Sequence, residues 1–437
     1  MADCPFNSAS ETIADFIYRY GSQQQIIGNP EDIPCMDFVS TDFSIIYTPL
    51  DTVEPISLRR TSYYSIPGLY TLLDSSSMEA SGILSTHSSP ALGNRGRGVL
   101  IGIIDTGIDY TNPLFRNPDG TTRINSIWDQ SLPEDKTLIP PGVPNRYNAS
   151  GATYGTEYTR EQINQALESD DPLALVPSTD TNGHGTFLAG IAAGGFLPEE
   201  DFTGAAPECE LLIVKLKPAK QYLRDFYLVS SDADAYQEND IMMGIKYLRV
   251  EAFSRGKPLV ILLGIGSNLG SHEGTSPLSV MLQDISRYLG TATVIAAGNE
   301  TGRGHHYMGT IPTGESSVDV EIRVGQPESQ RGFVVELWAS TIDTYSVGFL
   351  SPSGETISRI PIIAGNETSI PFLLEPTVIT VNYQLIESGA GKQLIFMRFR
   401  NPVAGIWKVR VYNTQYFTGE FHMWLPSEGP ASDETVF

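Results

Sequence analysis

Continuous apolar runs rich in β-branched residues recur through the middle of this chain. They span residues 99–104, 211–216, 259–263 and 293–297. A strand with one exposed face alternates apolar and polar residues, so unbroken runs are typical of strands covered on both faces. Between the second and third runs, Asn239 or Asp240 can cap a helix that ends at Gly256. The pattern predicts an α/β domain built on a parallel sheet.

Polar residues stand where two of these predicted strands end. Asp105 directly follows the first run, and Asn299 follows the fourth. Open α/β sheets bind their ligands at the carboxyl ends of the strands. His184 lies between Gly183 and Gly185, which let the backbone approach another element closely. Taken singly, each has a more common explanation. An aspartate like Asp105 more often caps a helix or forms a turn, a histidine like His184 more often lies on the surface, and an asparagine like Asn299 is common in turns. Together, a carboxylate, an imidazole and an amide are the orienting group, base and oxyanion donor of serine-type acyl transfer.

The segments around these three residues resemble the subtilisin-like serine proteases, the subtilases. They are residues 103–109 (Ile-Ile-Asp-Thr-Gly-Ile-Asp), 182–186 (Asn-Gly-His-Gly-Thr) and 296–300 (Ala-Ala-Gly-Asn-Glu). The resemblance covers roughly residues 97–303 and implies peptide-bond hydrolysis by an Asp-His-Ser triad. It implies that Asp105 orients the imidazole and that His184 takes the proton of the nucleophile. Asn299 would donate a hydrogen bond to the oxyanion, a contact worth ~3–4 kcal/mol.

A further segment resembles the subtilase strand that pairs with the backbone of the substrate. It is residues 262–268, Leu-Leu-Gly-Ile-Gly-Ser-Asn. The resemblance implies that Gly264, Ile265 and Gly266 bind a protein substrate as an added β-strand. Gly264 stands where the family usually has serine.

The nucleophile of the triad is not found in its expected place. No Gly-Thr-Ser motif follows Asn299, and the run from Gly274 to Pro277 (Gly-Thr-Ser-Pro) precedes it. Ser276 before Pro277 suits the N-cap and first position of a helix. We therefore expect the serine to lie outside this sequence. The catalytic domain would then be incomplete, with an open sheet edge. A truncated sequence, a nicked protein whose missing C-terminal fragment is a separate polypeptide, and a natural remnant all remain open.

Residues 1–75 are expected to form a prodomain-like α/β unit ahead of a catalytic domain at 76–303. Residues 8–10 can cap a helix, and residues 44–50 are typical of a strand. The expected helix carries Ile13, Phe16, Ile17 and Tyr20 on one face. Residues 66–96 are rich in Ser, Gly and Pro and suit a linker. We expect the unit to fold against the Gly264 to Gly266 strand as an intramolecular chaperone and inhibitor. A segment within 66–80 would then lie in the cleft.

The pattern changes to alternating residues after Gly304. Val318, Val320 and Ile322 alternate with charged residues, and further strands are expected at 333–338, 345–350, 377–383, 394–399, 406–412 and 420–425. This spacing predicts an all-β sandwich of about eight strands at 304–430, with a jelly roll as first choice. Residues 431–437 would begin the return to the catalytic domain.

The arrangement of these parts is similar to the Csp-type germination proteases of spore-forming bacteria. Residues 72–83 and 96–105 add to that resemblance. The resemblance implies that the protein activates a cortex-degrading hydrolase during spore germination. Related subtilases in other contexts share the layout, so the reaction class is better supported than the physiological step.

Composition limits the partners and the compartment. The net charge of −23 and a pI near 4.6 argue against binding nucleic acid, which needs a basic face. No apolar run reaches the ~18–20 residues of a membrane span. The residues after Met1 do not resemble a secretory signal, so we expect a cytoplasmic, spore-associated protein.

The cysteines and the metal-binding positions predict no disulfide framework and no metal. Cys4, Cys35 and Cys209 are odd in number and widely spaced, which fits a reduced compartment. Cys209 lies between glutamates that would raise its pKa, so it is not a thiolate nucleophile. Leu114 replaces the aspartate that binds calcium in many subtilases, and we expect no cofactor.

Two functions of different class follow. The chain either belongs to an endopeptidase whose serine lies outside it, or is an inactive subtilase-like module that binds or regulates a partner protein. Intact Asp105, His184 and Asn299 favour the first function, and the missing serine favours the second.

Overall fold

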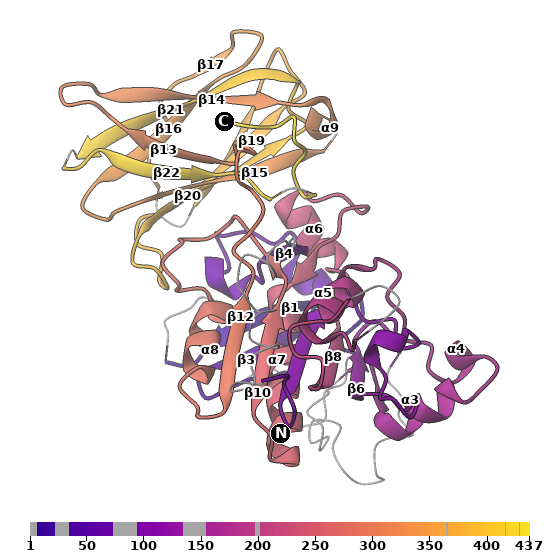
Figure 1. Ribbon diagram of the computed structural model, residues 1–437. Helices are drawn as coiled ribbons and strands as arrows, with labels where there is room; N and C mark the ends of the chain where they lie inside the picture. Colours follow the sequence, from indigo (N-terminus) through magenta and orange to yellow (C-terminus); the bar gives the residue numbers. More distant parts are fainter. Residues whose placement is uncertain are drawn as a thin grey trace.

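The computed structural model shows an α/β body and a β-sandwich, with an N-terminal sheet packed against the body (Figure 1). It describes residues 7–21, 35–72, 94–133, 154–196, 202–329, 331–363, 366–415, 417–427 and 429–437. Cys4 and most of the predicted linker at 66–96 lie outside these residues.

The body contains a six-stranded sheet in the order β12-β10-β5-β8-β6-β7. Its strands are β5 (Leu100–Asp105), β6 (Ile124–Asp129), β7 (Thr156–Thr159), β8 (Glu210–Lys215), β10 (Leu259–Leu263) and β12 (Thr291–Ile295). All neighbours are parallel except β7, which runs antiparallel to β6. The four apolar runs of the sequence are therefore strands of a parallel sheet, as predicted.

Helices cover both faces of this sheet. Helix α7 (Glu238–Arg255) packs on Ile104 and Val214 of one face, and helix α8 (Pro277–Ile285) contacts α7 and belongs to the same core. Helix α5 (His184–Ala193) packs on Ile103 and Ile213 of the other. This double coverage is the physical reason for the unbroken apolar runs. The remaining elements of the body are η3 (Pro113–Phe115), α3 (Arg160–Leu167), α4 (Pro172–Leu175), α6 (Gln221–Tyr227), β9 (Tyr236–Gln237) and β11 (Ile265–Gly266).

The N-cap of helix α7 lies two or three residues before the cap expected from the sequence at Asn239 or Asp240. Gln237 is its N-cap, whereas Asn239 and Asp240 are buried. The Asp240 carboxylate forms an ion pair with Lys217 instead of capping the helix. The helix ends at Gly256 in the left-handed conformation (φ 61°), as predicted.

The N-terminal unit is a three-stranded antiparallel sheet in the order β1-β3-β2. It comprises β1 (Ile13–Arg19), β2 (Met36–Phe38), β3 (Phe43–Pro49), α1 (Leu50–Val53), η2 (Tyr63–Ser65) and β4 (Leu69–Leu72). Strand β3 confirms the strand expected at 44–50. The helix predicted to carry Ile13, Phe16, Ile17 and Tyr20 is wrong, because residues 13–19 form β1.

Burial on both faces explains this error. Ile13 and Ile17 pack into the core around α7. Ala14 and Phe16 point to a second core that also contains Trp338 of the sandwich. A strand covered on both sides lacks alternation, and its apolar positions can match a helical spacing.

The expectation of unpaired cysteines is also wrong. Cys35 is disulfide-bonded, whereas Cys209 is a free, buried thiol. Spacing along the chain does not report distances in the fold, and those distances decide whether two cysteines can pair. Burial, above all, raises the pKa of Cys209 to about 11, so this thiol stays protonated as expected.

The sandwich consists of a six-stranded sheet (β13-β22-β15-β20-β19-β18) and a four-stranded sheet (β14-β21-β16-β17). The strands are β13 (His306–Thr310), β14 (Ser317–Val324), β15 (Gly332–Ala339), β16 (Thr344–Leu350), β17 (Thr356–Ile357), β18 (Glu367–Pro371), β19 (Val378–Gln384), β20 (Gln393–Arg400), β21 (Gly405–Gln415) and β22 (Glu420–Trp424), with one short helix, α9 (Gln326–Ser329). The two-layer β-region is as predicted, and the jelly-roll topology stays a prediction. The sequence missed β13, β17 and β18, which have two to five residues.

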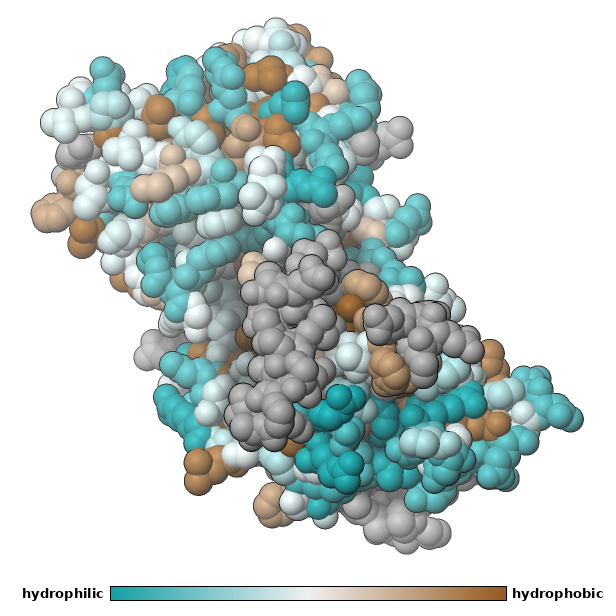
Figure 2. Space-filling view, in the orientation of Figure 1, coloured by the Kyte–Doolittle hydropathy of each residue, from teal (hydrophilic) through white to brown (hydrophobic). Residues whose placement is uncertain are grey.

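A shared core joins the N-terminal unit, the body and the sandwich. Glu336 of β15 is fully buried there. It accepts hydrogen bonds from the Tyr63 hydroxyl (2.5 Å) and from the Gly270 backbone (2.8 Å). Hydrophilic and apolar residues are mixed over the face shown in Figure 2. Within the described ranges, no helix has the length and apolar character needed to cross a membrane.

Candidate active site

Asp105 and His184 meet at the carboxyl end of the central strand β5. The Asp105 Oδ1 atom lies 2.7 Å from His184 Nδ1. Asp105 is 1% exposed, and the His184 side chain is 14% exposed. The backbone N–H of Thr106 also donates to Asp105 Oδ1, at 2.7 Å. A buried carboxylate on Nδ1 orients the ring so that Nε2 is the nitrogen that can exchange a proton with a substrate or nucleophile.

Both glycines that flank His184 are required by the geometry. Gly183 has a φ of 90°, which favours glycine. A Cβ on Gly185 would lie 2.3 Å from the carbonyl oxygen of Gly107. The absence of that Cβ lets α5 approach the loop after Asp105. The close approach expected from the sequence is confirmed for Gly185, whereas Gly183 serves the backbone conformation and a Cβ there would meet nothing within 4 Å.

Asp180 holds the His184 loop against the Asp105 loop, and sequence reasoning missed it. One carboxylate oxygen accepts from Thr106 Oγ1 (2.8 Å) and Gly183 N (2.9 Å). The other accepts from the backbone (2.8 Å) and hydroxyl (2.7 Å) of Thr186. Burial alone would raise the pKa of Asp180, but these hydrogen bonds outweigh it and leave the pKa lowered. The sequence feature that could have indicated this role is an acidic residue four positions before His184.

A strand of the N-terminal unit occupies the groove beside this pair. Strand β11 pairs antiparallel with β4, with Ile265 opposite Leu72 and Gly266 opposite Thr71. The other edge of β4 pairs with β9. A Cβ on Gly264 would lie 3.4 Å from His184 Cε1, so this strand-binding slot begins beside the imidazole. The prediction that a segment within 66–80 lies in the cleft agrees with this pairing.

Asn299 follows the edge strand β12 and is exposed. It lines a hollow of about 480 Å³ together with Thr71 of β4 and the acidic residues Asp232 and Asp234. Asn299 thus lies on the same side of the sheet as the slot. Among the described residues no strand pairs with the outer edge of β12, and Val294 is 50% exposed there.

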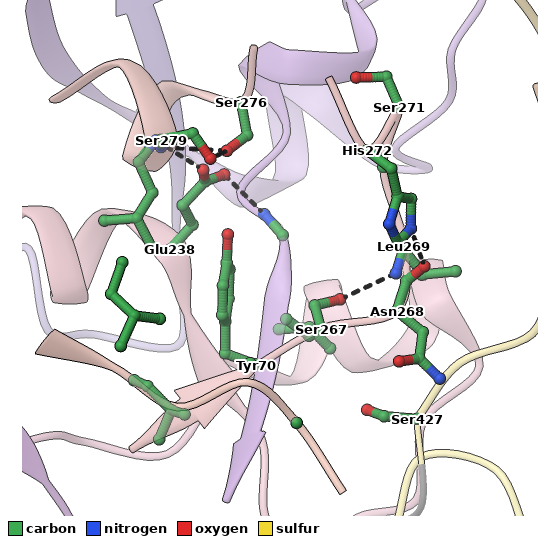
Figure 3. Close-up of a pocket in the computed structure, with 18 of the residues that line it drawn as sticks. Tyr70, Glu238, Ser267, Asn268, Leu269, Ser271, His272, Ser276, Ser279 and Ser427 are labelled. Carbon is green, nitrogen blue, oxygen red and sulfur yellow. Dashed lines mark hydrogen bonds between the residues drawn. The ribbon is translucent and has the colours of Figure 1, made fainter. Parts of the chain in front are cut away.

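Ser276 acts as a helix cap, as the sequence suggested. Its hydroxyl accepts from the backbone of Ser279 (3.1 Å) and donates to the hydroxyl of Ser279 (2.8 Å) at the start of α8. It lines a pocket of about 510 Å³ that also contains Tyr70 and Glu238 (Figure 3). Within the described ranges, no group of three or more His, Cys, Asp or Glu residues is placed to hold a metal ion.

Comparison with known proteins defines the class. The sequence profile of the subtilase family matches residues 96–355, more than half of the chain. The chain belongs to the subtilase family, and its body has the corresponding α/β fold with a parallel sheet.

Individual relatives are similar over different shares of the chain. The solved structure of the CspB protease of Clostridium perfringens has a TM-score of 0.67 and 27% identity, and the match covers 82% of this chain and 67% of that one. The PII-type proteinase of Lacticaseibacillus paracasei is 25% identical over 61% of this chain, and subtilisin-like protease SBT3.10 of Arabidopsis thaliana is 32% identical over 25%. The chain spans only 12% and 14% of the length of these two curated relatives.

Proposed function

We propose that the chain belongs to a serine endopeptidase in which Asp105 and His184 are two members of the triad. The 2.7 Å bond between them, beside a groove that already holds an extended strand, carries this proposal. Asp105 orients the imidazole and stabilises its protonated form. His184 takes the proton of the serine hydroxyl as that oxygen attacks the peptide carbonyl, and then returns the proton to the leaving amine.

Asn299 is proposed as the oxyanion donor. Its amide would donate a hydrogen bond to the negative oxygen of the tetrahedral intermediate. Its position beside Thr71 of the bound strand supports this role.

We propose that the serine is supplied by polypeptide outside these 437 residues. The exposed outer edge of β12, with Val294 and Ile295 about half exposed, supports this proposal. A segment that paired with this edge would cover those side chains. It would also bring new residues to the sheet end that carries Asp105 and Asn299.

Residues 1–75 are proposed to act as an intramolecular chaperone and inhibitor. Strand β4 fills the groove, and a buried ion pair between Asp15 and Lys220 joins the unit to the body. We also propose that the protein substrate is a hydrolase of spore germination. The resemblance of its parts to the Csp-type germination proteases supports this assignment.

A serine-directed fluorophosphonate tests the proposed function. The polypeptide 1–437 should neither label nor hydrolyse peptides. A longer chain that restores a Gly-Thr-Ser segment should label and cut itself within residues 66–80. The His184→Ala variant of that longer chain should lose both reactions, because the triad members act as a unit. Labelling of the 437-residue form would show that another hydroxyl is the nucleophile.

The second candidate is an inactive module that binds a partner protein. The absence of a Gly-Thr-Ser motif after Asn299 in this sequence favours it. A longer chain that folds but never labels would establish this alternative.

A further inference from the structure

Arg398 of β20 is a buried cation with few partners. Arg123, Arg224 and Arg398 are 5%, 6% and 5% exposed, and a guanidinium group stays charged in a protein. Arg123 and Arg224 each donate to three backbone carbonyl groups. Within the described residues Arg398 donates to one, the carbonyl of Asp225, at 2.9 Å. The Nε atoms of Arg123 and Arg398 are both buried without a partner, so the difference between these two lies at the outer guanidinium nitrogens.

The charge of Arg398 also lacks a carboxylate partner in the part of the chain that the structure describes. Acidic residues are not scarce, since they outnumber basic ones by 51 to 28. The nearby Asp225 carboxylate accepts instead from Gln221 Nε2, one turn earlier on α6, at 2.8 Å. Burial first, and then the positive charge of Arg400, lowers the pKa of Arg398 to about 10. A buried charge is costly unless it is paired, so this guanidinium is suited to an anion from outside the chain.

Arg398 and Arg400 line a hollow of about 350 Å³, here called the arginine pocket. They are two residues apart on β20, so both side chains lie on the same face of the sheet. The N-terminal unit contributes Pro55 and Ile56 to the pocket, and α6 contributes Phe226. Figure 1 shows α6 where the body meets the sandwich. Apolar walls with a few charged groups, at a junction between domains, are typical of a small-molecule site.

We propose that the arginine pocket binds a small organic monocarboxylate. Its carboxylate would contact the guanidinium groups of Arg398 and Arg400, because the planar fork of donors matches the two oxygens of a carboxylate. Its apolar part would lie against the ring of Phe226, whose centroid is 5.3 Å from the guanidinium carbon of Arg398. This site does not depend on the proposed protease activity.

Two exposed acidic residues limit the charge of the ligand. Glu54 and Asp225 also line the arginine pocket. They repel a doubly charged anion such as phosphate more strongly than a monocarboxylate. The pocket therefore favours a single negative charge on an apolar body.

Occupancy of the pocket would hold the N-terminal unit in place. The ligand would contact Ile56 of that unit, Phe226 of the body and Arg398 of the sandwich at once. A ligand that binds only the assembled arrangement stabilises that arrangement by mass action. The carboxylate is thus a regulator of how often the N-terminal unit leaves the body.

Calorimetric titration of the 437-residue chain with sodium benzoate tests the site. Benzamide, which has the same ring without the charge, should bind at least about tenfold more weakly, because the charge-assisted hydrogen bonds are lost. Inorganic phosphate should also bind more weakly than benzoate. Absence of saturable benzoate binding, equal binding of benzamide, or tighter binding of phosphate would each overturn the proposal.

Variants of the two arginines separate a binding role from a structural one. Arg398→Gln and Arg400→Gln should each weaken benzoate binding about tenfold. Without ligand, Arg398→Gln should unfold at the same or a higher temperature than the parent chain, because the lost charge has no partner. Arg410→Gln is the control, since Arg410 already pairs with Asp319 in the other sheet of the sandwich. Its benzoate binding should match that of the parent. Unchanged benzoate binding in both pocket variants, or a lower unfolding temperature of Arg398→Gln, would show that these arginines serve the fold alone.

Hydrogen–deuterium exchange tests the effect on the N-terminal unit. The Glu54 N–H donates to the Leu50 carbonyl at 3.0 Å and closes α1 beside the pocket. At a benzoate concentration about ten times the dissociation constant, exchange of this amide should slow about tenfold. The Arg398→Gln variant should show no such slowing at the same concentration. Benzoate binding that leaves this exchange unchanged would overturn the regulatory part of the proposal.

Discussion

Gly264 and Leu188 pack so closely that a Cβ on Gly264 would lie 2.1 Å from Leu188 Cδ1. The same Cβ would lie 3.3 Å from Asp105 Oδ2, a buried oxygen without a hydrogen-bond partner. Gly264, which stands where the family usually has serine, thus leaves the space that Leu188 of α5 occupies. The two residues set the distance between the strand-binding slot and the imidazole.

We therefore predict that Gly264→Ser destabilises the chain by about 1–3 kcal/mol, because the side chain overlaps Leu188. Leu188→Ala alone should cost about 2–5 kcal/mol through the cavity it leaves. The double variant should lose clearly less stability than the sum of the two single losses. Leu188→Ala makes room for the new serine side chain, and that side chain fills part of the cavity. Urea denaturation measures all three values, and additive costs would contradict the packing argument.

The close approach at Gly185 gives a second prediction. Gly185→Ala should force α5 away from Gly107 and break the bond between His184 and Asp105, because the added Cβ would lie 2.3 Å from a carbonyl oxygen. The low-field imidazole N–H signal in the proton NMR spectrum should disappear. Gly190 on the same helix is the control, because a Cβ on Gly190 would meet only Leu114 Cδ1, at an ordinary contact distance of 3.8 Å. Gly190→Ala should keep the signal, and loss of the signal in both variants would refute the argument.

The buried ion pair between the N-terminal unit and the body gives a third prediction. Lys220 Nζ lies 2.7 Å from Asp15 Oδ1, and both side chains are 1% exposed. Asp15→Ala should cost about 3–5 kcal/mol of folding free energy, because it leaves a buried ammonium group unpaired. Glu273→Ala, which removes the more exposed pair with Lys392, should cost less than about 1 kcal/mol. Equal losses in the two variants would show that the buried pair has no special role.

The fourth prediction concerns pH and Glu238. Burial raises its pKa in the folded chain from 4.5 to about 7. Between these values the folded state holds a proton that the unfolded state has released. The contribution of Glu238 to stability is therefore full below pH 4.5 and is lost as the pH rises through 7. The loss should amount to about 3 kcal/mol, and Glu238→Gln should remove this part of the pH dependence in denaturant titrations. If the unfolding free energy of the Glu238→Gln variant falls with pH as steeply as that of the parent chain, the prediction is wrong.

Much of the body could be predicted from local sequence. The strands that end at Asp105 and before Asn299 are continuous apolar runs, which predicted their strand character. For β5 the run also reports burial on both faces, whereas β12 is largely exposed at the edge of the sheet. The glycines around His184 mark a close backbone approach. The strands and the glycines depend on neighbouring residues, so the sequence by itself determined them. The pairing of Asp105 with His184, which lie 79 positions apart, was implied by the resemblance to the subtilases and not by a local pattern.

Tertiary structure decided the features that depend on distant segments. Residues 13–19 form a strand because cores on both sides cover them, a context absent from their own periodicity. The disulfide at Cys35 likewise depends on the folded distance between cysteines. Asp180 and Glu238 act through backbone N–H groups contributed by other segments. For all of these, the deciding interactions are long-range, and no local pattern of residue types encodes which partner will lie opposite.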